Sequence, residues 1–161
     1  MITAEDVETR KEALEKILPY QRGDFEELFK AMDGYSVNIR FLDPPLHEFL
    51  PHTDDEIAEL AKTMGLSFGE LKSTVENLHE FNPMMGHRGC RLDVSYPEIA
   101  EMQTRAVIEA AINVTKETGH PVTPEIMIPL VGDVKELKYV KNVVVKTADK
   151  LIAESGLEYE I

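Results

Sequence analysis

The sequence predicts an α/β fold in which a few parallel strands alternate with surrounding helices. Three observations support this prediction: repeated helix-start patterns, two apolar strand-like segments, and the alternation of helices with strands along the chain. The chain has 161 residues, of which 43% are hydrophobic and 29% charged, so it can bury a core of ordinary size. We therefore treat residues 1–161 as a single segment of one domain.

The predicted helices begin where Ser, Thr or Asp is followed three residues later by an acid, because this pair satisfies two otherwise orphaned backbone donors. Six such pairs precede helical apolar spacing: Thr3 and Asp6, Asp24 and Glu27, Thr53 and Glu56, Ser67 and Glu70, Ser95 and Glu98, and Asp133 and Glu136. Glycine favours the left-handed C-cap conformation, so helix ends are expected at Gly34, Gly65, Gly119 and Gly156. The two long C-terminal helices then span 97–118 and 134–154, and their apolar stripes should lie on a sheet.

Two buried parallel strands are predicted at 36–42 and 125–131. Side chains alternate along the first strand, so Arg40 points away from the face that carries Val37. A third, shorter extended segment is expected at 84–88, after a turn signal. Three strands are few for a doubly wound sheet, and a closed (β/α)₈ barrel takes roughly 250 residues. The sequence therefore predicts a partial (β/α)₈ TIM barrel with about three parallel strands and surrounding helices.

Charge and composition exclude several classes of function. The chain carries 30 Asp and Glu against 17 Lys and Arg, a formal net charge of −13, so we expect no nucleic-acid partner. One cysteine, Cys90, excludes an intrachain disulfide and a cysteine-based zinc cluster. No apolar run approaches the roughly 18 residues that cross a bilayer, and no hydrophobic signal core begins the sequence. We therefore expect a cytoplasmic protein without membrane contact.

Arginines at the ends of strand-like segments are the leading candidates for a binding site. Arg40 lies near the C-terminal end of the first predicted strand, and Arg88 and Arg91 lie in NPMMGHRGCRL. Guanidinium groups bind phosphate or carboxylate through two parallel charge-assisted hydrogen bonds. Ligands of α/β barrels bind at the C-terminal ends of the strands. These arginines therefore predict an anion site.

The same arginines have a purely structural alternative. Arg40 is spaced to form an ion pair with Asp43 or Glu48, and Arg91 with Asp93. From spacing alone, such ion pairs are the more common outcome.

Other chemistry-bearing residues give weaker signals. The five histidines lack the spacing that places two ligands on one metal, so no metal ligand is assigned. His47, beside Glu48, could serve acid–base chemistry, although anchoring a loop is the commoner role. Cys90 has an arginine neighbour that could lower the thiol pKa, but a small buried cysteine beneath a glycine turn is commoner. Glycine loops that cradle a nucleotide are absent from the sequence.

Several blocks of the sequence carry a family resemblance. They are VNIRFLDPPLHEFLPH (37–52), NPMMGHRGCRL (82–92), YPEIAEMQTRAVIEAA (96–111) and PEIMIPLVG (124–132). Together they resemble the C-terminal phosphoenolpyruvate/pyruvate-binding barrel of the pyruvate, phosphate dikinase family. The resemblance covers nearly the whole chain, and LDPPLHEF is its most specific block.

The resemblance implies that residues 1–161 are an internal part of this barrel domain. The implied enzyme is cytoplasmic, depends on Mg²⁺, and interconverts ATP, pyruvate and phosphate with AMP, phosphoenolpyruvate and diphosphate through a phosphohistidine. Arg40 and Arg88 match the family arginines that bind the phosphoryl group of phosphoenolpyruvate. The implied partners are phosphoenolpyruvate or pyruvate, the rest of the dikinase chain with its phosphohistidine domain, and a second subunit of a homodimer.

The resemblance also implies that this chain lacks a complete catalytic set. The family's Mg²⁺ ligands, its proton-donating cysteine and its phosphohistidine lie in segments that the sequence does not contain, and Cys90 has a different context. The isolated segment should therefore be inactive. The alternative is a non-catalytic module that senses phosphoenolpyruvate or binds a partner protein through exposed barrel edges.

Overall fold

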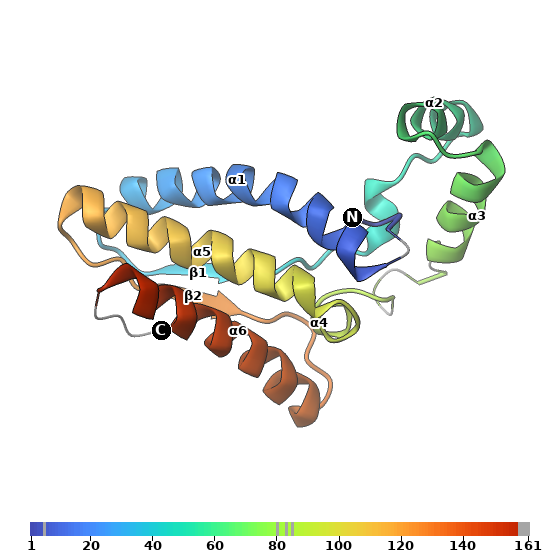
Figure 1. Cartoon of the computed structure of the whole chain (residues 1–161). Coiled ribbons are helices and arrows are strands. Elements are labelled where there is room, and N and C mark those ends of the chain that lie inside the picture. Colours follow the sequence, from blue (N-terminus) through green and yellow to red (C-terminus); the bar gives the residue numbers. More distant parts are fainter. Residues whose placement is uncertain (5, 80, 83, 85, 158–161) are drawn as a thin grey trace.

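The fold is α/β and mostly helical in a computed structural model that describes residues 1–4, 6–79, 81–82, 84 and 86–157 (Figure 1). The elements in order are α1 (Val7–Met32), β1 (Val37–Arg40), the 3₁₀ helix η1 (Leu46–Phe49), α2 (Asp54–Met64), α3 (Phe68–Leu78), α4 (Cys90–Ser95), α5 (Pro97–Thr118), β2 (Pro124–Met127) and α6 (Val134–Ser155). No helix in this described part is both long and apolar enough to cross a membrane.

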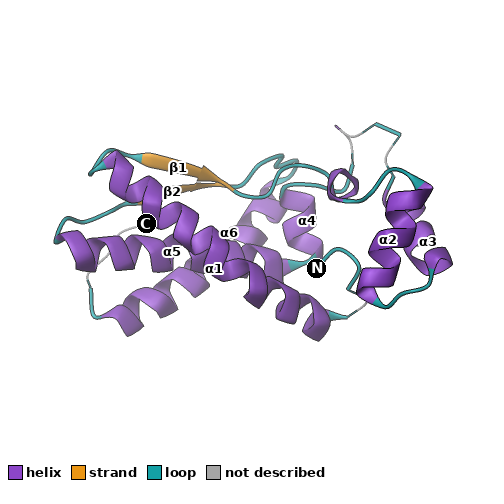
Figure 2. Cartoon of the chain, turned by 90° about the horizontal axis from the view of Figure 1, so that it is seen from above, coloured by secondary structure: helices purple, strands orange, loops and turns teal. Residues whose placement is uncertain are grey.

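The two strands pair in parallel, as predicted, but are shorter than expected. Their register runs from Val37 opposite Pro124 to Arg40 opposite Met127. Figure 2 shows α1, α5 and α6 gathered on one side of this sheet. The opposite face exposes Asn38, Arg40, Glu125 and Met127. Parallel sheets are usually covered on both faces, so this sheet has one face open that a larger fold would cover.

The predicted third strand at 84–88 is wrong for the residues that the structure describes. Met85 lies outside them, Gly86 and His87 form bends, and Arg88 has no regular structure. The backbone N–H of Cys90 donates to the carbonyl oxygen of Pro129 at 2.8 Å, so this segment crosses the end of β2 and turns into α4. The described residues therefore form two parallel strands and not a closed barrel.

The helix α5 is the centre of the core. Ile99, Met102 and Ala106 pack against Leu14 and Leu18 of α1. Further along α5, the cluster of Val107, Ala110, Ala111 and Val114 includes Phe29 of α1 and Ile39 of β1. On the other side, Ala100 packs with Phe41, Cys90 and Val140 and Val144 of α6. The two long C-terminal helices thus lie on the sheet, as the apolar stripes predicted.

Three of the predicted helix starts are capping boxes, at Thr53, Ser67 and Asp133. The left-handed C-caps at Gly65, Gly119 and Gly156 are also confirmed. At the end of α1 the left-handed cap is Asp33, and Gly34 follows it with a φ of 86°.

The start predicted at Asp24 is wrong, because α1 is one continuous helix of 26 residues that begins after the N-cap Asp6. Leu18 before this point and Phe29 after it are both buried against α5. Continuous packing along α5 therefore keeps residue 24 inside the helix.

The predicted helix at 97–118 is confirmed as α5, but the capping pair Ser95 and Glu98 is wrong, because Tyr96 is the N-cap and no side chain caps this helix start. Both members of the expected pair have other partners. The Ser95 hydroxyl lies 2.9 Å from His87 Nε2. Glu98 Oε1 accepts a hydrogen bond from Arg10 Nη1 at 2.6 Å, in a buried ion pair.

The α2–α3 hairpin stands apart from the main body in Figure 1. It has a small core of its own, made by Ile57 and Ala61 of α2 and Leu71 of α3. The hairpin lies in the chain between β1 and the segment that carries Arg88.

We expect Leu14→Ala to destabilise the fold, because Leu14 is 2% exposed between α1 and α5. Truncating a buried leucine removes apolar contacts and leaves a cavity, at a cost of about 2–5 kcal/mol. The same change at Leu28, an exposed position of α1, should cost less than about 1 kcal/mol. Urea denaturation of both variants measures the difference, and equal losses would contradict the α1–α5 core.

Candidate functional site

The candidate site lies where the chain leaves β1. Arg40 is the last residue of this strand, and Asp43 follows in the loop. Gln103 of α5 is buried, and its Oε1 accepts a hydrogen bond from the backbone N–H of Leu42 at 2.9 Å. The central helix therefore fixes the backbone directly before Asp43.

Asp43 brings the two predicted arginines together. Its Oδ2 lies 3.3 Å from Arg40 Nη1, and its Oδ1 accepts a hydrogen bond from Arg88 Nη2 at 3.1 Å. The ion pair between Arg40 and Asp43 is one of the structural alternatives that spacing offered. The bridge to Arg88 was not foreseen, because the sequence does not show that the loop before α4 returns to β1.

The two arginines are held unequally. Arg88 Nε also donates to the main-chain oxygen of Asp43 at 2.8 Å, and the Arg88 side chain is 13% exposed. Arg40 has its ion pair with Asp43 and a side chain that is 59% exposed. The position of the Arg88 side chain is therefore fixed by its contacts with Asp43, whereas the Arg40 side chain is held by one ion pair at the open face of the sheet.

A close contact between two loops places the segment that carries Arg88. Gly89 has a φ of 56°, and a Cβ at this position would lie 2.9 Å from the carbonyl oxygen of Pro129. Leu130, in the loop after β2, also has a positive φ of 56°. Together with the hydrogen bond from Cys90 to Pro129, this contact fixes the start of α4 against the end of β2. The sequence indicates a glycine turn next to Cys90, but it does not show which loop this turn contacts.

Arg91 and His87 brace the same segment internally. Arg91 Nη1 donates to the carbonyl oxygen of Gly86 at 3.3 Å. His87 Nε2 lies 2.9 Å from the Ser95 hydroxyl and 3.3 Å from the carbonyl oxygen of Arg91. The alternative pairing of Arg91 with Asp93 is wrong, because neither carboxylate oxygen of Asp93 has a hydrogen-bond partner among the described residues.

Cys90 and Asp93 are buried groups of α4. Cys90 is 0% exposed, and burial raises the pKa of its thiol, with the carboxylates of Glu136 and Asp93 acting in the same direction. Arg91 opposes this shift but has a smaller effect, and Cys90 is the small buried cysteine that the sequence favoured as the commoner outcome. Burial also raises the pKa of Asp93 to about 7. Neither side chain forms a hydrogen bond or ion pair with Arg40 or Arg88 among the described residues, and we assign neither to the site.

The described residues do not fit a Mg²⁺ site. They contain no group of three or more His, Cys, Asp or Glu side chains placed to hold a metal. The carboxylate of Asp43 is already engaged by two guanidinium groups. His47 Nδ1 is buried and has no hydrogen-bond partner among the described residues. The centre of the His47 ring lies 5.8 Å from the centre of the His79 ring.

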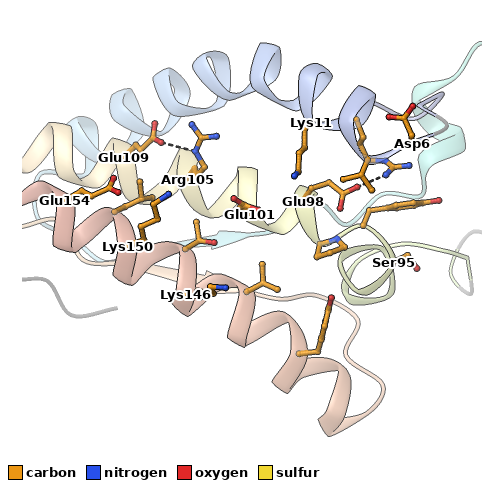
Figure 3. A pocket seen from close by; sticks show the side chains of 18 residues that line it. Asp6, Lys11, Ser95, Glu98, Glu101, Arg105, Glu109, Lys146, Lys150 and Glu154 are labelled. Atoms are coloured by element: carbon orange, nitrogen blue, oxygen red, sulfur yellow. Dashed lines mark hydrogen bonds and ion pairs between the residues drawn. The ribbon is translucent and has the colours of Figure 1, made fainter.

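A large open groove lies apart from the two arginines. It is a groove of about 1310 Å³ lined by α1, α5 and α6 (Figure 3). Charges of both signs line it, and several pair with each other, including Arg10 with Glu98 and Arg105 with Glu109. Because these charges neutralise each other, the groove is a poor candidate for an anion-binding site.

Comparison with known proteins shows the family to which this chain belongs. The chain belongs to the family described as PEP-utilising enzyme, PEP-binding domain, whose model matches residues 1–160.

The particular relatives are pyruvate, phosphate dikinases. The chain is 60% identical over 163 residues to that of Clostridium symbiosum, across 100% of this chain and 19% of the relative. It is 57% identical over 160 residues to that of Rhizobium meliloti (strain 1021), across 99% of this chain and 18% of the relative. It is 53% identical over 165 residues to the chloroplastic dikinase of Flaveria trinervia, across 100% of this chain and 17% of the relative. The chain thus spans about a fifth of the length of these relatives. One of these relatives is chloroplastic, so the cytoplasmic location of this chain stays a prediction.

We expect Gly89→Ala to destabilise the chain more than Gly34→Ala. Both glycines have positive φ, but a Cβ at Gly34 meets nothing within 4 Å. Gly34→Ala should therefore cost only the left-handed backbone penalty of about 1–2 kcal/mol. Gly89→Ala should cost about 1–3 kcal/mol more, because the loop that carries Pro129 must move. Chemical denaturation measures both, and equal costs would argue against the contact between the loops.

We expect Asp93→Asn to stabilise the protein at pH 8 and to have little effect near pH 4. The pKa of Asp93 is about 7 in the fold against an ordinary value of 3.8, so the unfolded chain releases this proton first. Stability therefore falls as pH rises from about 4 to 7, by on the order of a few kcal/mol. Asparagine resembles the protonated carboxyl and removes this loss. Thermal unfolding across this pH range, with the exposed Asp149→Asn as the control, tests it; parallel curves for wild type and Asp93→Asn would contradict it.

Proposed function

We propose that this chain is the phosphoenolpyruvate/pyruvate-binding segment of a longer pyruvate, phosphate dikinase, in which Arg40 and Arg88 bind the phosphoryl group of phosphoenolpyruvate. The observation that carries the proposal is the convergence of these two arginines on Asp43 at the C-terminal end of β1. The identity of 50–60% to dikinases along the chain supports the enzyme class.

The proposed role follows from the chemistry of phosphoryl transfer. In a metaphosphate-like transition state, charge is spread over three equatorial oxygens, and fixed cations stabilise it. Arginine suits this task because its planar fork offers several donors to phosphate oxygens and stays charged. Arg88, which the fold holds in place, would orient the group, and the more exposed Arg40 would complete its coordination.

In the proposed enzyme, the chain supplies one arc of a (β/α)₈ barrel. The open face with Asn38, Arg40, Glu125 and Met127 is the surface that would line the barrel interior. The remaining strands, the Mg²⁺ ligands, the proton donor and the phosphohistidine domain would come from other parts of a cytoplasmic, homodimeric dikinase. The segment would then bind substrate without catalysing the reaction alone.

We expect Arg40→Ala or Arg88→Ala in the full-length enzyme to reduce pyruvate phosphorylation by about 10²–10³-fold, the scale of removing one electrostatic donor. The half-reaction that consumes ATP and phosphate should be spared, because the phosphohistidine forms elsewhere. Isotope exchange measures the two half-reactions separately.

Arg22→Ala is the matched control, since it also removes an ion pair, between Arg22 of α1 and Glu109 of α5. Both exchange rates should stay close to wild type in this variant. Equal losses in the two half-reactions for the Arg40 and Arg88 variants would contradict a local role at the pyruvate site.

A further inference from the structure

We propose that Asp43 is a positioning residue for phosphoryl transfer: its carboxylate aligns Arg40 with Arg88 and lowers the positive charge that the pair presents to an incoming anion. This inference rests on the proposed function and gives Asp43 a role in the reaction, whereas the sequence offered it only as a possible ion-pair partner of Arg40. It concerns how Asp43 sets the alignment and the net charge of the two arginines, and not whether these arginines bind the substrate.

The geometry gives Asp43 two separable functions. Its main-chain oxygen accepts from Arg88 Nε at 2.8 Å, and this contact does not depend on the side chain. Its carboxylate oxygens divide between the arginines, with Oδ1 on Arg88 and Oδ2 on Arg40. Losing the carboxylate would therefore leave Arg88 anchored by the main chain while Arg40 loses the contact that holds it. Asp43 acts on the substrate only through these two cations.

The charges give the second half of the inference. Two guanidinium groups and one carboxylate have a combined charge of +1, so the carboxylate opposes a dianion that approaches the same nitrogens. It also occupies donors that a phosphoryl group would use. Asp43 should therefore weaken ground-state binding while keeping Arg40 close to its reactive position. Binding and turnover should respond in opposite directions when its charge is removed.

The test is Asp43→Asn in the full-length enzyme. We expect the Kd of phosphoenolpyruvate to fall at least about three-fold, because one nearby negative charge is gone. This binding is measured by calorimetry in enzyme whose phosphoryl-accepting histidine is replaced by alanine, so that the bound ligand cannot react. In enzyme that keeps this histidine, kcat of the pyruvate half-reaction should fall on the order of 10²-fold, because Arg40 is no longer aligned. The half-reaction with ATP and phosphate should not change.

Glu48→Gln is the matched control, because it removes the charge of an exposed carboxylate in η1, close in sequence, that forms no ion pair with Arg40 among the described residues. It should leave both Kd and kcat near wild type. Asp43→Glu keeps the charge and should keep Kd near wild type. Weaker phosphoenolpyruvate binding in Asp43→Asn, in parallel with lower turnover, would overturn this inference and leave a structural role only. If Arg40→Ala and Arg88→Ala do not weaken phosphoenolpyruvate binding, the proposed function itself fails.

Discussion

The burial of α5 is the constraint on which the other parts of this structure depend. Its apolar residues pack against α1 on one side, against α6 on another, and against the inner face of the sheet. Because one face of this helix is buried, polar side chains on that face need partners within the protein. Gln103 meets this need by accepting from Leu42, and so the core helix sets the backbone that leads into Asp43. Packing and site geometry are therefore linked through one buried amide.

The site also shows how a fold can hold two like charges together. The guanidinium groups of Arg40 and Arg88 would repel each other without the carboxylate between them. The Gly89 turn against Pro129 brings the second arginine to this carboxylate, which no contact within β1 could do. The arrangement combines a cation that the fold holds in place with a more exposed one, and this difference would suit the proposed binding of a phosphoryl group.

The open face of the sheet relates this chain to its longer relatives. The described residues give two parallel strands that are covered by helices on one face only, and the matched dikinases are about five times as long. A parallel sheet with an open polar face fits a part of a larger fold better than a finished layer. The α2–α3 hairpin has a small core of its own, and along the chain it lies between the two segments that carry the arginines.

The sequence by itself determined the local structure and the candidate residues. Capping pairs and C-terminal glycines located most helix boundaries because these signals act within a few residues, and the strand with Arg40 followed from alternation. The tertiary structure decided what local signals cannot encode. Packing along α5 overrode the helix start at Asp24, the contact with Pro129 replaced a third strand by a turn, and the same turn carried Arg88 to Asp43. Each of these outcomes depends on residues distant in the chain, so it became visible only when the helices and loops were placed together.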